Sequence, residues 1–170
     1  PLQERLMARQ DQGRFWWELR SCDYYAAFEQ PKLFYQVIQF HPQYAFDPVG
    51  RYGNDKTFFL STADRYLLAV LNSPLMWWHN WRYLPHMKDE ALNPAGFRME
   101  NLPIAVPAPA LRAEVEAKVE TVLALSGASL DAQRELLRWL RVEFAVEPGG
   151  RRLESFADLG PEDFVAEVRK

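Results

Sequence analysis

The stretch Pro31-Lys32-Leu33-Phe34-Tyr35-Gln36-Val37-Ile38-Gln39-Phe40 decides the fold class. Its aromatic and β-branched residues from Leu33 to Phe40 lie between two prolines, which predicts a strand. Thr57-Phe58-Phe59-Leu60 predicts a second strand. The segment between them is rich in turn-forming residues, namely Pro42, Pro48, Gly50, Gly53 and Asn54. We therefore expect a long loop there, and loops of that length in a compact domain are usually functional or disordered.

Two helices are predicted after the second strand. Asp64 is a suitable N-cap for a helix that runs through Leu71, and Ser73-Pro74 caps a second helix over 75–83. The second helix is dense in tryptophan. We expect Trp77 and Trp81 to share a buried face, and Trp78, His79 and Arg82 to be exposed.

The remaining chain predicts an edge strand followed by helices. Prolines interrupt residues 97–109, so Phe97 to Ile104 is expected to be an edge strand that leads into a linker. Apolar residues then recur at helical spacing on both sides of Gly127, which predicts an antiparallel helical hairpin closed by 148–150. A short last helix begins at Pro161. The predicted fold class is α+β: a mixed small sheet with aromatic-rich helices, a C-terminal helical hairpin and a short last helix.

Composition sets the general class. A chain of 170 residues that is 48% hydrophobic can bury a core of its own. Its single cysteine, Cys22, excludes an internal disulfide framework, suits a reducing cytoplasm and is expected to be a small packed residue. No apolar run approaches the about 20 residues of a membrane span, and no signal peptide is recognisable, so we expect a cytoplasmic protein without membrane contact.

The organisation suggests a piece of a longer polypeptide. The chain opens on Pro1 within a polar, helix-compatible stretch, so residues 1–12 are interpreted as a helical connector from a missing N-terminal part. Residues 13–107 form the predicted main domain, and residues 108–170 a helical segment. Net charge is −3, yet residues 31–88 carry six cations against three anions, whereas 111–170 carry nine against twelve. That mild positive balance fits a module that distinguishes one nucleic-acid sequence from another while a neighbouring domain makes most of the phosphate contacts.

No catalytic or metal site is predicted within the chain. Asn93-Pro94-Ala95-Gly96 lacks the second proline and the aromatic residue of the loop that adenine methyltransferases use, and it is interpreted as an ordinary turn. Glu116-Ala117-Lys118 matches a nuclease pattern but falls in a predicted helix, where such pairs are solvated. The spacing of the three histidines and Cys22 matches no metal-ligand pattern. We therefore expect the chain itself to be non-catalytic and to bind no cofactor.

The predicted loop has the chemistry of a nucleic-acid contact. Glycines let a backbone approach a ligand closely, Arg51 and Lys56 carry positive charge, and Asn54 offers a donor and an acceptor. Arg can bond guanine through two hydrogen bonds, and Asn can do the same with adenine. The alternative is a turn whose charges only keep it hydrated. Gly50-Arg51-Tyr52-Gly53 also matches the clamp of KH domains, but it lies between strands rather than helices.

Four blocks in a fixed order carry a family resemblance. They are Trp16-Trp17-Glu18-Leu19-Arg20, Pro31-Lys32-Leu33, Phe46-Asp47-Pro48-Val49-Gly50-Arg51-Tyr52 and Leu67-Leu68-Ala69-Val70-Leu71-Asn72-Ser73, followed by a closing Leu102-Pro103-Ile104. This order resembles the TaqI-like C-terminal specificity domain, the target-recognition part of type IIG restriction-modification enzymes and related adenine DNA methyltransferases. The resemblance covers residues 13–107.

The resemblance implies a function in DNA recognition. The chain would hold duplex DNA and read base edges for an N-terminal methyltransferase domain of the same polypeptide, which would use S-adenosylmethionine to methylate one adenine. The expected contact residues are polar or aromatic side chains of this region: Lys32, Arg51, Tyr52, Asn54, Lys56, Arg82 and Arg98. An alternative is a protein-interaction module that docks a partner subunit through its aromatic surface and helical tail.

Overall fold

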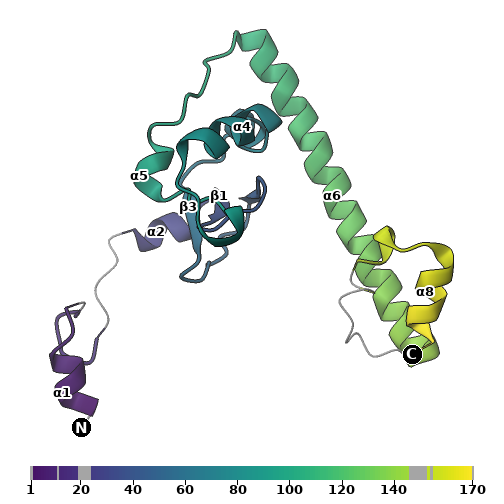
Figure 1. Cartoon of the computed structure of the whole chain (residues 1–170), viewed down its shortest axis with the longest axis horizontal. Helices are drawn as coiled ribbons and strands as arrows, with labels where there is room; N and C mark the ends of the chain where they lie inside the picture. Colours follow the sequence, from purple (N-terminus) through teal and green to yellow (C-terminus); the bar gives the residue numbers. More distant parts are fainter. Residues whose placement is uncertain (1, 11, 19–23, 146–152, 154, 170) are drawn as a thin grey trace. The chain divides into compact units, whose positions relative to one another are not determined.

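The computed structural model describes residues 2–10, 12–18, 24–145, 153 and 155–169. Helices outnumber strands and the strands form one small sheet, so the predicted α+β class is confirmed (Figure 1). The chain divides into two compact units, Pro1–Arg112 and Ala113–Lys170. Cys22 and the predicted closing turn at 148–150 lie outside the described residues.

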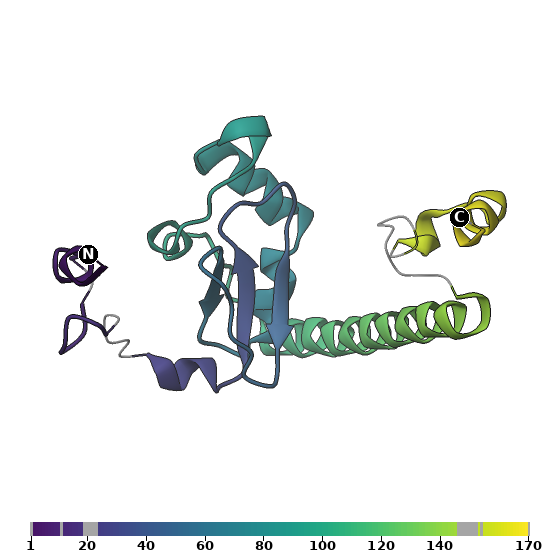
Figure 2. The same cartoon turned by 90° about the horizontal axis from the view of Figure 1, so that it is seen from below.

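Unit 1 is built on a three-stranded antiparallel sheet (Figure 2). Strands β1 (Lys32–Gln36), β2 (Tyr44–Asp47) and β3 (Thr57–Leu60) stand in the order β2-β1-β3. The sheet is therefore not mixed, and the strand predicted over 33–40 ends at Gln36. Strand β2 lies in what was expected to be loop, where Tyr44 and Phe46 alternate with Ala45 on a stretch too short for the pattern to stand out between Pro42 and Pro48.

The two faces of the sheet carry different chemistry because side chains alternate along each strand. The first face is apolar and consists of Leu33, Tyr35, Tyr44, Phe46, Phe58 and Leu60. Helix α3 (Arg65–Leu71) packs on this face through its buried Leu68 and Leu71. The second face carries the neighbouring pair Lys32 and Asp47, together with Phe34 and Phe59.

The predicted corner between the two helices is confirmed. The Asp64 side chain caps α3 by accepting a hydrogen bond from the Leu67 N–H at 2.9 Å. The Ser73 hydroxyl caps α4 (Pro74–Tyr83) by accepting from the Met76 N–H at 3.1 Å, and Pro74 occupies the first turn. Each cap satisfies an N–H group that has no partner inside its own helix.

Short helices complete unit 1: α1 (Leu2–Met7), α2 (Tyr25–Phe28), η1 (Lys88–Glu90) and α5 (Gly96–Met99). The edge strand predicted for 97–104 is wrong, because the Arg98 and Met99 N–H groups turn back to the Ala95 carbonyl at 2.8 and 3.3 Å. Pro103 then lacks an N–H group to donate to a neighbouring strand.

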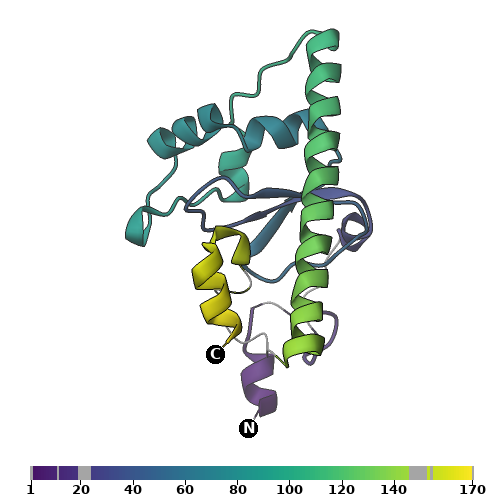
Figure 3. The ribbon, with the colours of Figure 1, turned by 90° about the vertical axis from the view of Figure 1, so that its right-hand side faces the viewer.

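Unit 2 consists of most of α6 (Pro109–Phe144), η2 (Phe156–Asp158) and α8 (Pro161–Val168). The predicted helical hairpin is wrong, because α6 is one continuous helix (Figure 3). A single glycine costs a helix only about 1 kcal/mol relative to alanine, so Gly127 does not end it. The short last helix is confirmed at Pro161. In the described ranges, no helix combines the length and the apolar character needed to cross a membrane.

Candidate nucleic-acid interface

The connection from β2 to β3, residues 48–56, crosses the second face of the sheet. Both strands are antiparallel to β1, which lies between them, so the chain must pass over β1 to reach β3. A Cβ atom added at Gly53 would lie 3.2 Å from the Phe34 ring, and one added at Gly50 would lie 3.2 Å from the Phe28 carbonyl oxygen. We call residues 48–56 the crossover loop.

Asp47 holds the start of the crossover loop. Its carboxylate accepts hydrogen bonds from the Arg51 N–H at 2.6 Å, the Val49 N–H at 3.3 Å and the Arg51 Nη1 at 3.0 Å. It also pairs with the Lys32 Nζ at 2.8 Å. Burial by itself would raise the pKa of Asp47, but the hydrogen bonds from Lys32, Arg51 and Val49 and the charge of Lys32 lower that pKa to about 2. The loop is therefore fixed by an ionised, nearly buried carboxylate.

Lys32 is not available to DNA, so its prediction as a contact residue is wrong. Its side chain is fully buried, and besides Asp47 its Nζ donates to the carbonyl oxygens of Phe28 at 2.6 Å and Gln30 at 3.3 Å. A buried ammonium with three acceptors is a structural group. Local sequence pattern could not show this, because Lys32 and its partner Asp47 are 15 positions apart in the sequence.

Asn54 holds the end of the crossover loop. Its Oδ1 accepts from the Lys56 N–H and from the Thr57 Oγ1, both at 3.0 Å, and its carbonyl accepts from the Thr57 N–H at 3.1 Å. These bonds fix the orientation of the side-chain amide. The residue itself is exposed, as are all of 51–56.

Tyr52 packs the middle of the loop against α2. Its ring stacks on Phe28 with centroids 4.8 Å apart and planes 8° from parallel, and its hydroxyl donates to the Glu29 carboxylate. The hydrogen bond to Glu29 raises the pKa of Tyr52. Tyr52 is nevertheless 59% exposed, so one side of the ring remains open to a ligand.

The loop cations are exposed but locally paired. The side chain of Arg51 is 68% exposed and bonds Asp47, while that of Lys56 is 69% exposed and lies 2.9 Å from Asp55. The Lys56–Asp55 pair lies on the surface, where ion pairs contribute little stability, so Lys56 can exchange Asp55 for a phosphate at small cost. Arg51 can exchange Asp47 for a base because the buried carboxylate keeps its bonds to Lys32 and to the loop N–H groups.

The other two predicted contact residues lie on helices of unit 1. Arg82 is on α4 with its guanidinium 5.7 Å from the Trp78 ring, and Arg98 is on α5 with its guanidinium 4.4 Å from the Phe97 ring. The Arg98 Nη1 also donates to the Asn93 side chain at 3.2 Å. A hollow of about 410 Å³ between the end of α4 and α5 includes Arg98 in its lining.

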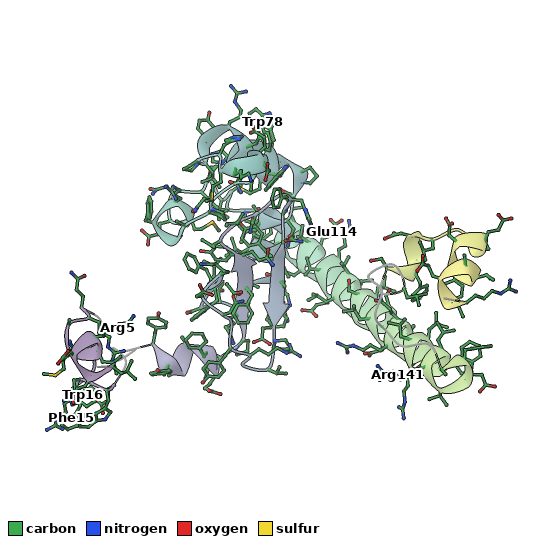
Figure 4. The ribbon with its side chains drawn as sticks, turned by 60° about the horizontal axis from the view of Figure 1, so that its bottom comes forward. Arg5, Phe15, Trp16, Trp78, Glu114 and Arg141 are labelled. Carbon is green, nitrogen blue, oxygen red and sulfur yellow. The ribbon has the colours of Figure 1, made fainter. Side chains whose placement is uncertain are left out.

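The buried face of α4 differs from the prediction. Met76 and Asn80 are buried, whereas Trp81 is 41% exposed and Trp77 is intermediate, so Trp81 is not a core residue. Trp78 is exposed as expected and projects from α4 among the outward side chains (Figure 4). The helical period groups 76 with 80 as well as 77 with 81, and the packing of unit 1 buries the first of these pairs.

The segments considered for catalysis occupy ordinary structural positions. Asn93 donates its N–H to the Pro85 carbonyl at 3.2 Å and accepts from Arg98, as a turn residue does. Glu116 and Lys118 lie within α6, and Lys118 pairs with Glu114 at 2.6 Å. Among the described residues, no three His, Cys, Asp or Glu side chains gather where they could hold a metal ion.

The fold and the crossover loop define a small α+β module that presents a braced, polar and aromatic loop on one face of its sheet. A family model described as a domain of unknown function, DUF8810, matches residues 108–170, which comprise α6, η2 and α8. No curated protein matches the chain.

Proposed function

We propose that the chain is the DNA target-recognition module of a type IIG restriction-modification enzyme or related adenine DNA methyltransferase. The observation that carries the proposal is the crossover loop, because it offers exposed cationic, amide and aromatic side chains from a backbone fixed at both ends by Asp47 and Asn54. A rigid support lowers the entropy lost when a loop binds its ligand.

The loop side chains divide into base readers and a phosphate contact. Arg51 can read a guanine edge in the major groove through two hydrogen bonds. Asn54 can donate from its Nδ2 to an acceptor on a base edge, because its Oδ1 already accepts from Lys56 and Thr57. Lys56 carries a point charge suited to phosphate, and Tyr52 offers a ring face for a sugar or base. Arg82 and Arg98 contact the backbone from α4 and α5. This division makes sequence choice depend on Arg51 and Asn54, and affinity depend on the cations.

The catalytic step belongs to another part of the polypeptide in this proposal. The resemblance implies an N-terminal methyltransferase domain with S-adenosylmethionine, which would act on an adenine of the site that this module selects. The module binds the duplex and sets the position of the catalytic domain along it, and it performs no chemistry itself.

A selection experiment tests the proposal. The chain is mixed with a pool of randomised DNA duplexes at low salt, bound duplexes are recovered over several rounds, and the enriched sequences are determined. We expect a short motif. Arg51→Ala and Asn54→Ala should each relax the preference at one base position, by about 1–3 kcal/mol, whereas Lys56→Ala should weaken binding to all sequences alike.

A matched control separates loop effects from general charge effects. Arg134→Ala removes an exposed arginine that pairs with Asp131 on α6, outside unit 1, and should leave the motif unchanged. A motif that survives both Arg51→Ala and Asn54→Ala would remove the crossover loop from DNA reading.

A second candidate function is a protein-interaction module. The observation that favours it is the exposure of apolar side chains along α6, with Val122, Leu125 and Val142 exposed by 60, 65 and 76%. Large exposed apolar surfaces mark interaction sites. This candidate predicts that the selection enriches no motif and that Lys56→Ala leaves DNA retention unchanged.

A further inference from the structure

An aromatic hollow of about 470 Å³ lies beside the edge strand β3. Its lining comes from four parts of unit 1: the chain around α2, the crossover loop, strands β1 and β3, and Gly96 at the start of α5. Ligand pockets for small molecules have volumes of roughly 300–1,000 Å³, so this one has room for a single planar ring system.

Aromatic rings that pack against one another form the walls of the aromatic hollow. Phe28 and Phe59 have centroids 4.7 Å apart, and Tyr24 lies 5.9 Å from Phe28 and 6.3 Å from Phe59. Tyr52 stacks on Phe28 from the crossover loop. Phe58 lines the same hollow and is 36% exposed, so a ring face remains open to a ligand.

The lining of the aromatic hollow also includes polar groups with a defined orientation. Asn54 lines it, and its Oδ1 is held by Lys56 and Thr57, so the amide cannot turn freely. Within the described part of the chain, its Nδ2 donates no hydrogen bond. Ser61 adds a hydroxyl and Asp55 a carboxylate. A ring that bears acceptors on one edge would satisfy the Asn54 donors.

We propose that the aromatic hollow binds a nucleobase that is unpaired or drawn out of the duplex, stacked on the Phe58 ring with its edge towards Asn54. The proposal rests on the proposed function for the DNA source of the base. Every base has a π-face, and stacking on aromatic residues tolerates any base, which matches a wall of phenyl rings. A free nucleoside offers the same chemistry, so the experiment has an arm for each source.

The test compares three fluorescently labelled duplexes by anisotropy with the full chain. One is fully paired, one carries a single bulged adenine, and one carries a bulged abasic nucleotide that bends the backbone without offering a base. We expect the bulged adenine to bind at least about fivefold more tightly than the abasic bulge. In the second arm, free adenosine should shift the backbone amide resonances of Phe58, Phe59 and Ser61.

Two variants and a control locate the bound base. Phe58→Ala removes a wall, and Gly96→Leu adds a side chain to the lining of the hollow at a position where an added Cβ has open space. Either variant should abolish the preference for adenine over the abasic bulge, with circular dichroism verifying the fold. Phe40→Ala removes a phenyl ring that is 60% exposed and lies outside the hollow, and this variant should keep the preference for adenine.

The outcomes separate the two proposals. Binding of all three duplexes with equal affinity overturns the aromatic hollow and leaves the DNA function standing. Adenosine shifts without duplex binding support the hollow and overturn the DNA function. A preference for adenine that survives Gly96→Leu places the base elsewhere and overturns the hollow, while an absence of any binding overturns both.

Discussion

Asp47 is the residue on which the crossover loop depends most. Its carboxylate is held ionised by Lys32 and by the backbone of the loop, with a pKa lowered to about 2 from an ordinary value of 3.8. A group whose pKa is lower in the folded state stabilises that state above its unfolded pKa. This contribution should be complete above about pH 4 and disappear as the pH falls towards 2.

We predict that the free energy of unfolding of unit 1 falls by about 2 kcal/mol between pH 5 and pH 2 through Asp47 alone. Denaturant unfolding of the wild type and of Asp47→Asn measures this, because the two proteins should differ most at pH 5 and converge at pH 2. Asp55→Asn, which alters an exposed pair, should not reproduce the effect. A difference between wild type and Asp47→Asn that is the same at both pH values would contradict the prediction.

Asn72 makes a long-range contact that its sequence block does not predict. Its side-chain Oδ1 accepts from the Tyr44 N–H at 3.1 Å and its Nδ2 donates to the Tyr44 carbonyl at 3.0 Å, so one amide closes the outer edge of β2. The capping roles of Asp64 and Ser73 followed from local pattern, because a cap acts within four residues. The bond from Asn72 joins groups 28 residues apart, and local pattern contains no information about it. The burial of Lys32 escaped prediction for the same reason.

At the scale of elements, the position of a residue along α4 determined its burial more than its hydrophobicity did. Trp77 and Trp81 share a face, and so do Met76 and Asn80, and only the packing of unit 1 selects the second pair for burial. Because Asn80 is polar, the hydrophobic pattern did not identify the face of Met76 and Asn80 as the buried one. Strand β2 was missed because its four residues give only two alternations, whereas β3 and the boundaries of α3 were correctly predicted from phenylalanine content and capping.

The continuity of α6 leads to a prediction about glycine. Gly127 lies inside the helix, and a Cβ added there meets no atom within 4 Å. Gly127→Ala should therefore raise the free energy of unfolding of unit 2 by about 1 kcal/mol, since alanine loses less backbone entropy. Chemical denaturation followed by circular dichroism measures it.

Gly50 provides the opposite case for the same substitution. Its φ is +78° and an added Cβ would lie 3.2 Å from backbone atoms of Phe28 and Glu29, so Gly50→Ala should destabilise unit 1.

A loss of stability in Gly127→Ala would contradict the prediction for α6, and would mean that the helix is bent or broken at that position in solution.

At the scale of the whole molecule, the two units divide near the start of α6. The division falls after Arg112, whose Nη2 pairs with Asp64 at 2.7 Å and whose guanidinium lies 5.4 Å from the Tyr66 ring. The first turn of α6 is thus attached to unit 1, and the matched family segment, 108–170, begins just before it. Helical periodicity predicted that this segment is helical, but not that one continuous helix would include residues of both units.

Charge over the whole chain limits how strongly the proposed module can hold DNA. The net charge is −3, and the residues from 111 onwards carry more anions than cations. With Lys32 buried, the cations available among the predicted contacts are Arg51, Lys56, Arg82 and Arg98. Each neutralised phosphate contributes about −0.9 to the slope of log Kobs against log salt concentration, so four contacts predict a slope no steeper than about −4.

Binding titrations of the selected duplex at several salt concentrations measure this slope. Lys56→Ala should make it shallower by about 1, whereas Lys118→Ala, which removes a lysine paired with Glu114 on α6, should leave it unchanged. A slope near −8 would require phosphate contacts from cations beyond these four, and the DNA-binding surface would then have to extend past the crossover loop, α4 and α5. A shallow slope instead assigns most of the phosphate grip to the catalytic domain, and leaves this module the task of choosing the site.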